Sequence, residues 1–256
     1  MIQQTAIIHR DATVPQDCEI GPYCVIGADV VLGAGCRLHP HVVIAGPTRI
    51  GRSNEFFPFS SIGQKTQDLK YTGEPTHLEI GDGNVFREFT TVNRATGKGD
   101  KTVVGHRNTF LAYAHVAHDC VLGDQIVMSN SGTLAGHVIV EDHAVIGGFT
   151  AIHQFCRIGR MAITGGCSKV VQDIPPFMMA DGNPASVRTI NKVGLERNGV
   201  AEEIQKHLRT AYKLLYRESG LNIGQAVARI RKELPASPEL LHLCEFVEKT
   251  ERGIGR

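Results

Sequence analysis

An apolar residue recurs at every sixth position over most of the chain. The register holds for ten successive positions from Ile8 to Ile62, returns at Ile80, and runs through ten more positions from Val104 to Ile158. The next residue is often Gly, and the fourth residue after the apolar one is usually small. Repetition at a fixed period is typical of solenoid proteins. A short strand and a tight turn fit each unit, with glycine relieving strain at the corner.

Three such units would close one triangular coil of about 18 residues, and coils would stack roughly 4.8 Å apart through backbone hydrogen bonds. About nine coils would form a prism on the order of 40 Å long. The apolar residue would fill the interior, and the small one would lie where two walls converge. The 28 glycines and the absence of Trp agree with a core of short, branched side chains. We therefore predict a mostly β fold, a β-helix.

The cysteines fit the same repeat. Five of the seven occupy the small inward position, and we interpret them as buried structural thiols. These are Cys18, Cys24, Cys36, Cys120 and Cys156. The odd number of cysteines and the lack of a CxxC pair argue against a disulfide framework and against a metal or redox site built from thiols.

Charge and hydropathy exclude two classes of partner. The 27 basic residues nearly balance the 26 acidic ones, so no electrostatic footprint for nucleic acid is present. No basic-then-apolar N-terminal segment is present, and no run approaches the roughly 18 apolar residues of a membrane span. We expect a cytoplasmic protein without a membrane span.

The six-residue pattern fails after Val170, and helical spacing begins at about Ala201. Asn222 is placed to cap a second helix, and Ser237 followed by Pro238 to start a third. Residues 173–186, with three prolines, are expected to form a linker. We predict a β-helix over 1–186 and a small helical domain over 187–256, which could cover the open end of the solenoid.

The repeat is interrupted twice, and such interruptions map to loops that often carry function. The segment 94–103 resembles a phosphate-binding loop in composition, but it lacks the adjacent Gly-Lys-Ser/Thr and leads into a strand, so we reject that interpretation. The segment 63–79 is richer in polar groups, offering Gln67, Asp68, Lys70 and Tyr71.

The stretch HVAHDC, His115 to Cys120, contains two histidines and an aspartate. An advance of one coil leads from His118 to Gly136, beside His137, and a second advance leads to Gln154, beside His153. These groups should align along one edge, one coil spacing apart. Aligned histidines permit a zinc site shared across a trimer boundary. They also permit general base catalysis by His118, with Asp119 supplying the orienting carboxylate.

Four motifs make the family recognisable. QDLKYTGEPT (67–76), AHVAHDC (114–120), LAGHV (134–138) and AIHQFC (151–156), set among the hexads, resemble the UDP-N-acetylglucosamine O-acyltransferase family of lipid A biosynthesis. The resemblance covers essentially the whole chain. It implies a left-handed parallel β-helix, assembled as a homotrimer with active sites between subunits. The implied substrates are a 3-hydroxyacyl chain on the phosphopantetheine of acyl carrier protein and UDP-N-acetylglucosamine, without a metal or diffusible cofactor.

The resemblance also implies roles for individual residues. His118 would be the general base, Asp119 its partner, and the Gly136 amide the donor to the thioester oxyanion. Gly166 falls at the position that sets acyl-chain length, where a missing side chain predicts a longer chain. Substrate-binding roles would fall to Gln67, Asp68, Lys70, His115, His137, His153, Gln154, Asn191 and Arg197.

Three positions depart from the family pattern. Val193 stands where glutamate is usual and Asn198 where a second arginine is usual, so nucleotide contacts should be weaker. TIHRGT reads TVNRAT here, with Asn93 in place of histidine, which leaves a 3-hydroxyl and a 3-amino acceptor both open.

Three other functions compete with this interpretation. The pathway's N-acyltransferase has an extra N-terminal domain, for which hexads starting at Ile8 leave no room. A zinc hydratase on the same solenoid is a second enzyme class, and a purely structural solenoid is the third alternative.

Overall fold

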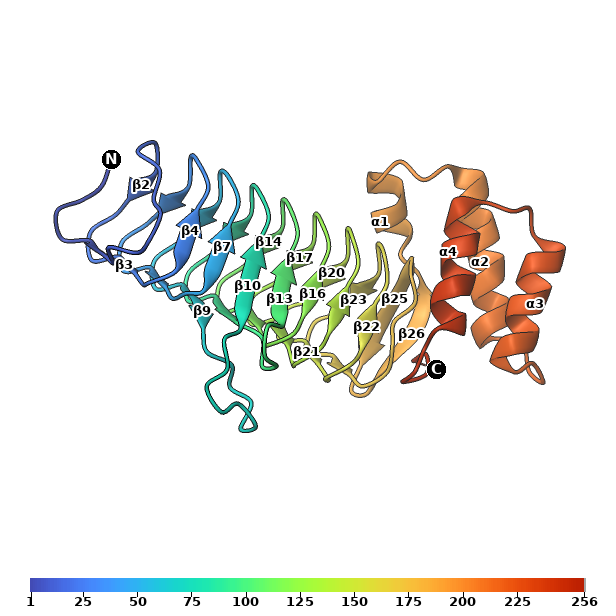
Figure 1. The fold of residues 1–256 in the computed structure, drawn as a ribbon. Helices are drawn as coiled ribbons and strands as arrows, with labels where there is room; N and C mark the ends of the chain where they lie inside the picture. The colour runs from blue at the N-terminus through green and yellow to red at the C-terminus, as the bar shows by residue number, and fades with distance from the viewer. Residues whose placement is uncertain (256) are drawn as a thin grey trace.

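Three parallel sheets form the walls of a long prism in the computed structural model, which describes residues 1–255 (Figure 1). We number the walls in the order in which a coil crosses them. The first face consists of β1 (Ile7–Ile8), β3 (Val25–Ile26), β6 (Val43–Ile44), β9 (Ser61–Gln64), β12 (Thr91–Asn93), β15 (His115–Val116), β18 (Thr133–Leu134), β21 (Ala151–Ile152) and β24 (Lys169–Val170). The second face consists of β4 (Val30–Leu32), β7 (Thr48–Ile50), β10 (His77–Ile80), β13 (Lys101–Val104), β16 (Val121–Leu122), β19 (Ile139–Val140) and β22 (Arg157–Ile158).

The third face is the longest of the three. It consists of β2 (Glu19–Ile20), β5 (Arg37–Leu38), β8 (Glu55–Phe56), β11 (Val85–Phe86), β14 (Thr109–Phe110), β17 (Val127–Met128), β20 (Val145–Ile146), β23 (Ile163–Thr164), β25 (Met178–Gly182) and β26 (Ala185–Ile190). All pairings are parallel except the last, between β25 and β26. The fold is therefore a parallel β-helix.

The predicted coil length is present in the strand register. Val25 pairs with Val43 on the first face, and His115 pairs with Thr133 further along it. From Ile20 to Ile158, every apolar residue of the six-residue register is at most 4% exposed. Burial of these side chains supplies the main stabilisation of the prism.

The five cysteines predicted to occupy the small inward position are all buried, as expected. Burial raises the pKa of the Cys120 thiol to about 12 and that of Cys156 to about 11. Both are therefore protonated at neutral pH and unreactive.

The same inward position also holds a row of asparagines, at Asn54, Asn84 and Asn108, which are at most 1% exposed. The Asn84 side chain donates to Asn54 Oδ1 (2.9 Å) and to the Gly105 carbonyl (3.0 Å), and its Oδ1 accepts from the Asn108 N–H (2.8 Å). Each amide thus bridges two coils, which satisfies polar groups that would otherwise be buried without partners.

Tight turns join the three faces. At most corners the third turn residue has a positive φ, for example 65° at His41 and at Phe59. The second turn residue is proline at Pro22, Pro40 and Pro58. Proline fits there because the N–H of the second residue has no partner within such a turn.

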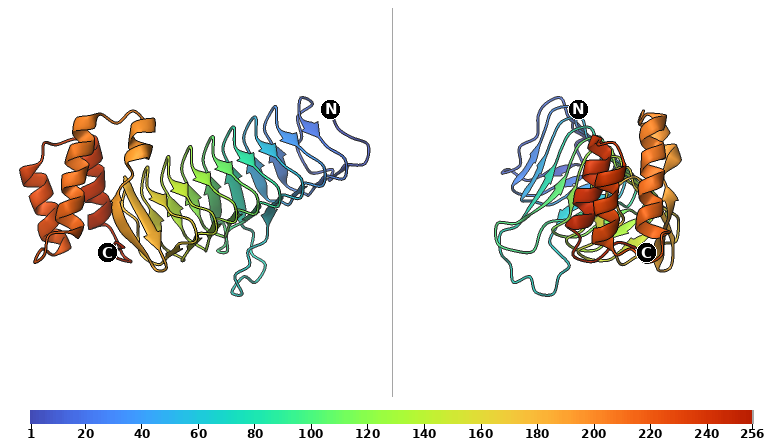
Figure 2. Two further views of the ribbon diagram at one scale, coloured as in Figure 1. Left: turned by 180° about the vertical axis from the view of Figure 1, so that it is seen from behind. Right: turned by 90° about the vertical axis from the view of Figure 1, so that its right-hand side faces the viewer.

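Both interruptions of the repeat leave the same corner, the one between the first and second faces. Ser61 pairs with Thr91, and Thr91 pairs with His115, so these two coils are longer than the regular coil in which Val25 pairs with Val43. The longer loop, between β9 and β10, projects away from the prism (Figures 1 and 2).

The expectation of a linker over 173–186 is wrong, because this segment contains β25 and the start of β26. Phe177, Met178 and Ala180 are buried and close the end of the prism. Pro176 takes the second position of a corner turn in which Phe177 is the third residue, with φ of 68°, so the prolines form part of a coil. The predicted boundary at Ser186 falls inside β26, which runs to Ile190.

Four helices follow β26: α1 (Lys192–Arg197), α2 (Glu202–Tyr216), α3 (Ile223–Glu233) and α4 (Pro238–Glu248). The predicted caps are confirmed: Asn222 forms a capping box with Gln225, and Ser237 accepts from the Leu240 N–H. The short helix α1 was not predicted. The helices lie at one end of the prism, opposite the N-terminus (Figure 2). Within residues 1–255, no helix is long and apolar enough to cross a membrane.

The asparagine row generates a stability prediction. Asn84→Ala should lower the free energy of unfolding by more than about 2 kcal/mol, because it leaves the Gly105 carbonyl and the buried Asn108 N–H of the next coil unpaired. It also removes one of the two hydrogen bonds that Asn54 Oδ1 accepts from Asn84. Asn130→Ala, at an exposed position, is the matched control and should change it by no more than about 0.5 kcal/mol. Denaturant unfolding measures both. Equal effects of the two substitutions would contradict a structural role for the row.

Candidate active site

Successive coils align His118 with Gly136 and Asp119 with His137 at the corner between the first and second faces. The His137 N–H donates to the His118 carbonyl (3.0 Å), and the Phe155 N–H donates to the Gly136 carbonyl (3.2 Å). We call this edge the histidine ridge, and define it as His118, Asp119, Gly136, His137, His153, Gln154 and Phe155. The alignment expected from the regular coil advance is therefore present in the structure.

Ring contacts run along the histidine ridge. The His118 and His137 rings meet edge to face, with centroids 5.3 Å apart, and His137 stacks on Phe155 at 4.7 Å. Sequence analysis did not select Phe155, although it lies one coil after His137 and the same advance would have found it.

His118 and Asp119 form a tight pair. Nδ1 of His118 lies 2.7 Å from Oδ2 of Asp119, and the side chains are 13% and 9% exposed. A carboxylate can only accept, so this contact assigns the proton of the neutral ring to Nδ1 and leaves Nε2 free to accept a proton.

Asp119 is held from several directions. Its carboxylate accepts from the Thr96 N–H (3.2 and 3.3 Å), and its own N–H donates to Thr102 Oγ1 (2.8 Å). Nε2 of His137 lies 3.7 Å from Oδ2. These contacts fix the carboxylate against the imidazole, as an orienting group requires.

Gly136 packs directly against the His118 ring. A Cβ atom at Gly136 would lie 2.3 Å from Cε1 and 2.6 Å from Nε2 of His118, so only glycine fits. Gly136 is also the second residue of its turn, followed by His137 with φ of 60°. Within residues 1–255, its N–H has no hydrogen-bond acceptor. A free N–H thus lies beside a free imidazole nitrogen.

His115 lies on β15, next to the histidine ridge. Its Nδ1 lies 2.7 Å from Thr91 Oγ1. Burial lowers the pKa of His115, and the nearby charge of His118 lowers it further. His115 is therefore neutral at pH 7 and is suited to hydrogen bonding rather than to carrying charge.

The two inserted loops are joined to each other and to Asp119. The hydroxyls of Thr66 and Thr96 lie 2.8 Å apart, and Asn93 Nδ2 donates to the Lys65 carbonyl (2.9 Å). Thr96 in turn holds Asp119. A hydrogen-bonded path therefore runs from the long loop to the His118 pair.

The predicted loop residues lie near the tip of that loop. Gln67 and Lys70 are exposed, and Asp68 Oδ1 accepts from the Lys70 N–H (2.9 Å). The intervening Leu69 is fully exposed. In the described part of the chain, none of these side chains contacts the histidine ridge.

Three other predicted residues lie on different corners. Asn191 Nδ2 donates to the Met161 carbonyl (2.8 Å) at the corner between the second and third faces, and its Oδ1 caps α1, which carries Arg197. Gly166 lies at the corner between the third and first faces, where an added Cβ would meet only the Gly148 carbonyl, at 3.4 Å. Asn191, Arg197 and Gly166 therefore lie away from the histidine ridge of the same chain.

Among residues 1–255, one group of three side chains is close enough to hold a metal ion. It consists of His118, Asp119 and His137, whose ligand atoms lie within 4.8 Å of one another. An ion there would compete with the hydrogen bond between His118 and Asp119, and it would occupy the groups that a base mechanism needs.

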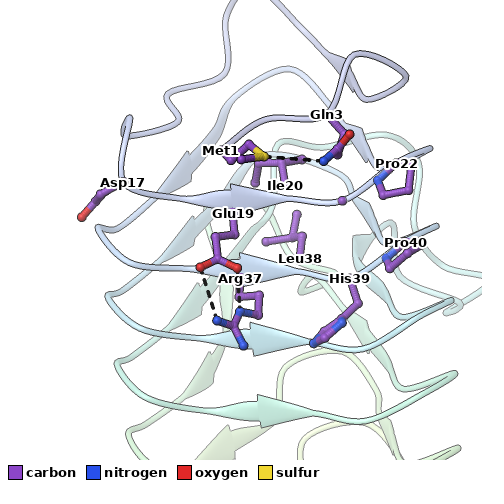
Figure 3. Close-up of a pocket in the computed structure, with 11 residues that line it drawn as sticks. Met1, Gln3, Asp17, Glu19, Ile20, Pro22, Arg37, Leu38, His39 and Pro40 are labelled. Atoms are coloured by element: carbon purple, nitrogen blue, oxygen red, sulfur yellow. Dashed lines mark hydrogen bonds and ion pairs between the residues drawn. The ribbon is translucent and has the colours of Figure 1, made fainter.

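A separate hollow of about 710 Å³ lies near the N-terminal end of the prism, far along the chain from the histidine ridge (Figure 3). Its lining includes an ion pair between Arg37 and Glu19 at 2.9 Å. His39 also lines it, and its Nε2 lies 2.8 Å from Glu55 Oε1, so the imidazole and the carboxylate there occupy each other.

Residues 173–255 match the family described as UDP-N-acetylglucosamine O-acyltransferase, domain 2, and residues 11–46 match the bacterial transferase hexapeptide family. An acyl-[acyl-carrier-protein]–UDP-N-acetylglucosamine O-acyltransferase from Thermodesulfovibrio yellowstonii is 50% identical over 256 residues, covering 100% of this chain and 99% of the relative.

Solved structures give the same result. LpxA from Acinetobacter baumannii is 44% identical, with a TM-score of 0.96 over 100% of this chain and 99% of that one. LpxA from Bacteroides fragilis, a UDP-N-acetylglucosamine acyltransferase, is 38% identical, with a TM-score of 0.97 over 100% of both chains. Since identity and fold agree over the full length, this chain belongs to the UDP-N-acetylglucosamine O-acyltransferase family.

Proposed function

We propose that this protein transfers a 3-hydroxyacyl chain from acyl carrier protein to the 3-hydroxyl of the glucosamine in UDP-N-acetylglucosamine, the first step of lipid A biosynthesis. It would meet both substrates in the cytoplasm. The Thermodesulfovibrio yellowstonii relative is named for an acyl group on acyl carrier protein and for UDP-N-acetylglucosamine. The observation that carries the proposal is the His118–Asp119 pair packed on Gly136, because it supplies a base and an oxyanion donor side by side.

The chemistry follows from the free atoms. Nε2 of His118 removes the proton of the sugar hydroxyl, and Asp119 stabilises the imidazolium that forms. The oxygen attacks the thioester carbon, and the resulting oxyanion accepts from the Gly136 N–H. Collapse forms the ester, breaks the carbon–sulfur bond, and returns the proton from His118 to the departing thiolate, which leaves as the thiol. The proton and the oxyanion both have protein partners, so we propose that no metal or diffusible cofactor takes part.

The site is completed by other copies of the chain. Asn191, Arg197 and Gly166 lie on corners away from the histidine ridge, so a second chain would supply them. We propose a homotrimer of left-handed prisms in which each ridge faces a neighbouring chain. Asn191 and Arg197 of that neighbour would hold the uridine and phosphate end, since guanidinium suits phosphate oxygens. Gln67, Asp68, Lys70, His115, His137, His153 and Gln154 would line the remaining cleft.

One observation keeps a 3-amino acceptor as a second candidate. Asn93 is 4% exposed, and its buried Oδ1 has no hydrogen-bond partner among residues 1–255. An amide oxygen accepts from an amine as readily as from a hydroxyl. Mass spectrometry of the product formed when both sugar nucleotides are offered together decides between an ester and an amide.

Replacing the base should abolish transfer without unfolding the protein. His118→Ala should lower kcat by at least about 100-fold, the usual contribution of a positioned general base. His9→Ala, exposed at the far end of the prism, is the control and should retain full activity. Product formation and circular dichroism measure the two properties. Turnover of His118→Ala near that of the unsubstituted protein would contradict the assignment of His118 as the general base.

Acyl length should depend on the space beside Gly166. Because an added side chain would meet little protein there, Gly166→Met should fold normally. Its side chain should then occupy the space where the acyl chain would lie. We expect kcat/KM for long acyl donors to fall about tenfold or more relative to short ones. Competition between donors of different length, read by mass spectrometry, measures the ratio. Unchanged use of long donors would show that this position does not set length.

A further inference from the structure

The end of the chain returns to the histidine ridge. Ile254 pairs in parallel with Asp173, the Asp173 N–H donates to the Gly253 carbonyl (2.9 Å), and the Gly255 N–H donates to the Asp173 carbonyl (3.0 Å). Ile254 is 2% exposed and packs in the core. The terminal segment is thus built into the prism as part of its last coil.

The Asp173 side chain fixes the start of this segment. It is 1% exposed, and its carboxylate accepts from the Thr250 hydroxyl (2.7 Å) and from the Arg157 N–H (2.8 Å). The carboxylate is therefore occupied by two partners on separate elements, which hold the chain between Thr250 and Gly255 in one place.

This arrangement places Arg252 beside the histidine ridge. Nη2 of Arg252 lies 3.3 Å from Nδ1 of His153, and its Nε and Nη2 each lie 3.4 Å from the Val171 carbonyl. All of these acceptors are neutral. Within residues 1–255, no carboxylate forms an ion pair with this guanidinium, which is only half-buried. The buried Asp173 carboxylate acts on this guanidinium only through space, without a direct ion pair. A fixed cation without a direct ion-pair partner, next to an exposed imidazole, is a ready site for an anion.

The position of Arg252 along the ridge indicates which anion it binds. The base lies on the coil of His118, and the proposed oxyanion donor lies one coil further, at Gly136. His153 is on the next coil, and Arg252 lies beyond it. Two coil spacings, about 10 Å, therefore separate the thioester position from the Arg252 end. The phosphopantetheine arm begins at the thioester and ends in a phosphate, so it is long enough to bring an anion to this end of the ridge.

We propose that Arg252 binds the phosphate of the phosphopantetheine arm that carries the acyl group, with His153 as its neighbour. This inference rests on the proposed function and adds a donor-recognition residue that the sequence motifs did not indicate. The thiol is at one end of that arm and the phosphate at the other, so a cation far along the ridge recognises the donor without touching the reacting atoms.

Paired donors that differ only in the phosphate test this directly. Acyl-phosphopantetheine and acyl-pantetheine are compared with the unsubstituted protein, Arg252→Gln and Arg252→Lys. Arg252→Gln should lower kcat/KM for the phosphorylated donor about 10- to 100-fold, the usual range for a hydrogen-bonded charge. It should leave the dephosphorylated donor within about twofold, and Arg252→Lys should restore part of the loss. The KM for the sugar nucleotide should not change.

Lys249→Gln is the matched control, because Lys249 is an exposed cation that pairs with Glu245 and lies just before the terminal segment. It should behave as the unsubstituted protein. An equal loss with both donors in Arg252→Gln would mean a merely structural role, and a raised KM for the sugar nucleotide would assign Arg252 to the nucleotide phosphates. Either result overturns the inference.

Direct binding separates this inference from the proposed reaction. Calorimetry with phosphopantetheine and with pantetheine, each without an acyl group, requires no turnover. The unsubstituted protein should bind the phosphorylated compound more tightly, and Arg252→Gln should lose the difference. If the protein shows that difference but transfers no acyl group, the proposed function fails and the anion site stands. If the unsubstituted protein does not distinguish the two compounds, the anion site fails regardless of activity.

Discussion

Backbone hydrogen bonding between coils is the constraint on which the rest of this structure depends. Most strands have only two residues, and a single wall of such strands would be marginal. Each coil is instead bonded to the next on three faces, and the sheets extend across nine, seven and ten strands. The coil spacing therefore repeats along the whole prism, and any residue type that recurs once per coil becomes a stack. The Phe56, Phe86 and Phe110 rings, with centroids 4.8 and 4.7 Å apart, are such a stack in the core.

The site uses the same repetition on the outside. The wall fixes the backbone under His118 and Gly136, so the imidazole and the free N–H meet without help from a flexible segment. The wall holds the Asp119 backbone through Thr102 on β13, but the carboxylate needs a further donor. That role falls to the shorter inserted loop, through Thr96, and the longer loop supports it through Thr66. A rigid scaffold thus sets the positions of the reacting groups, while loops from the same corner adjust and cover them.

Sequence reasoning succeeded where the repeat is strict. A period of six predicted the inward residues from Ile20 to Ile158, the buried cysteines and the alignment of His118 with Gly136. Sequence reasoning failed where the interactions of a particular residue override the repeat. Asn84 occupies a position expected to be small, because its amide bonds to two coils at once. The prolines before β25 favour a linker, but the apolar Phe177 and Met178 that follow them are buried and make this segment part of the prism.

Two other features could not be predicted from the spacing of neighbouring residues in the sequence. The helix α1 is only six residues long, too short for helical periodicity to reveal. Arg252 reaches the histidine ridge through a contact with His153, 99 residues earlier in the chain. A contact over that distance depends on how the end of the chain packs against the last coil, and nothing in the spacing of nearby residues encodes it.

A ridge on the outside of a prism is convex, and this shape bears on how the proposed reaction could occur. The covered pair, His118 and Asp119, is 13% and 9% exposed, whereas His137 is 42% exposed. A thioester and an alkoxide must react away from bulk water, because hydrolysis competes and charge stabilisation weakens in a high dielectric. The inserted loops shield only His118 and Asp119 from water. The rest of the ridge, from His137 toward Arg252, would need another protein surface to exclude water. Gly166 and Arg197 are exposed on parts of the same chain away from this edge, and Asn191, which is 7% exposed, lies at the start of the helix that carries Arg197. In a threefold assembly each chain would therefore contribute its ridge to one site and its other corners to another, which explains why residues with one proposed task are spread over three edges of a single chain.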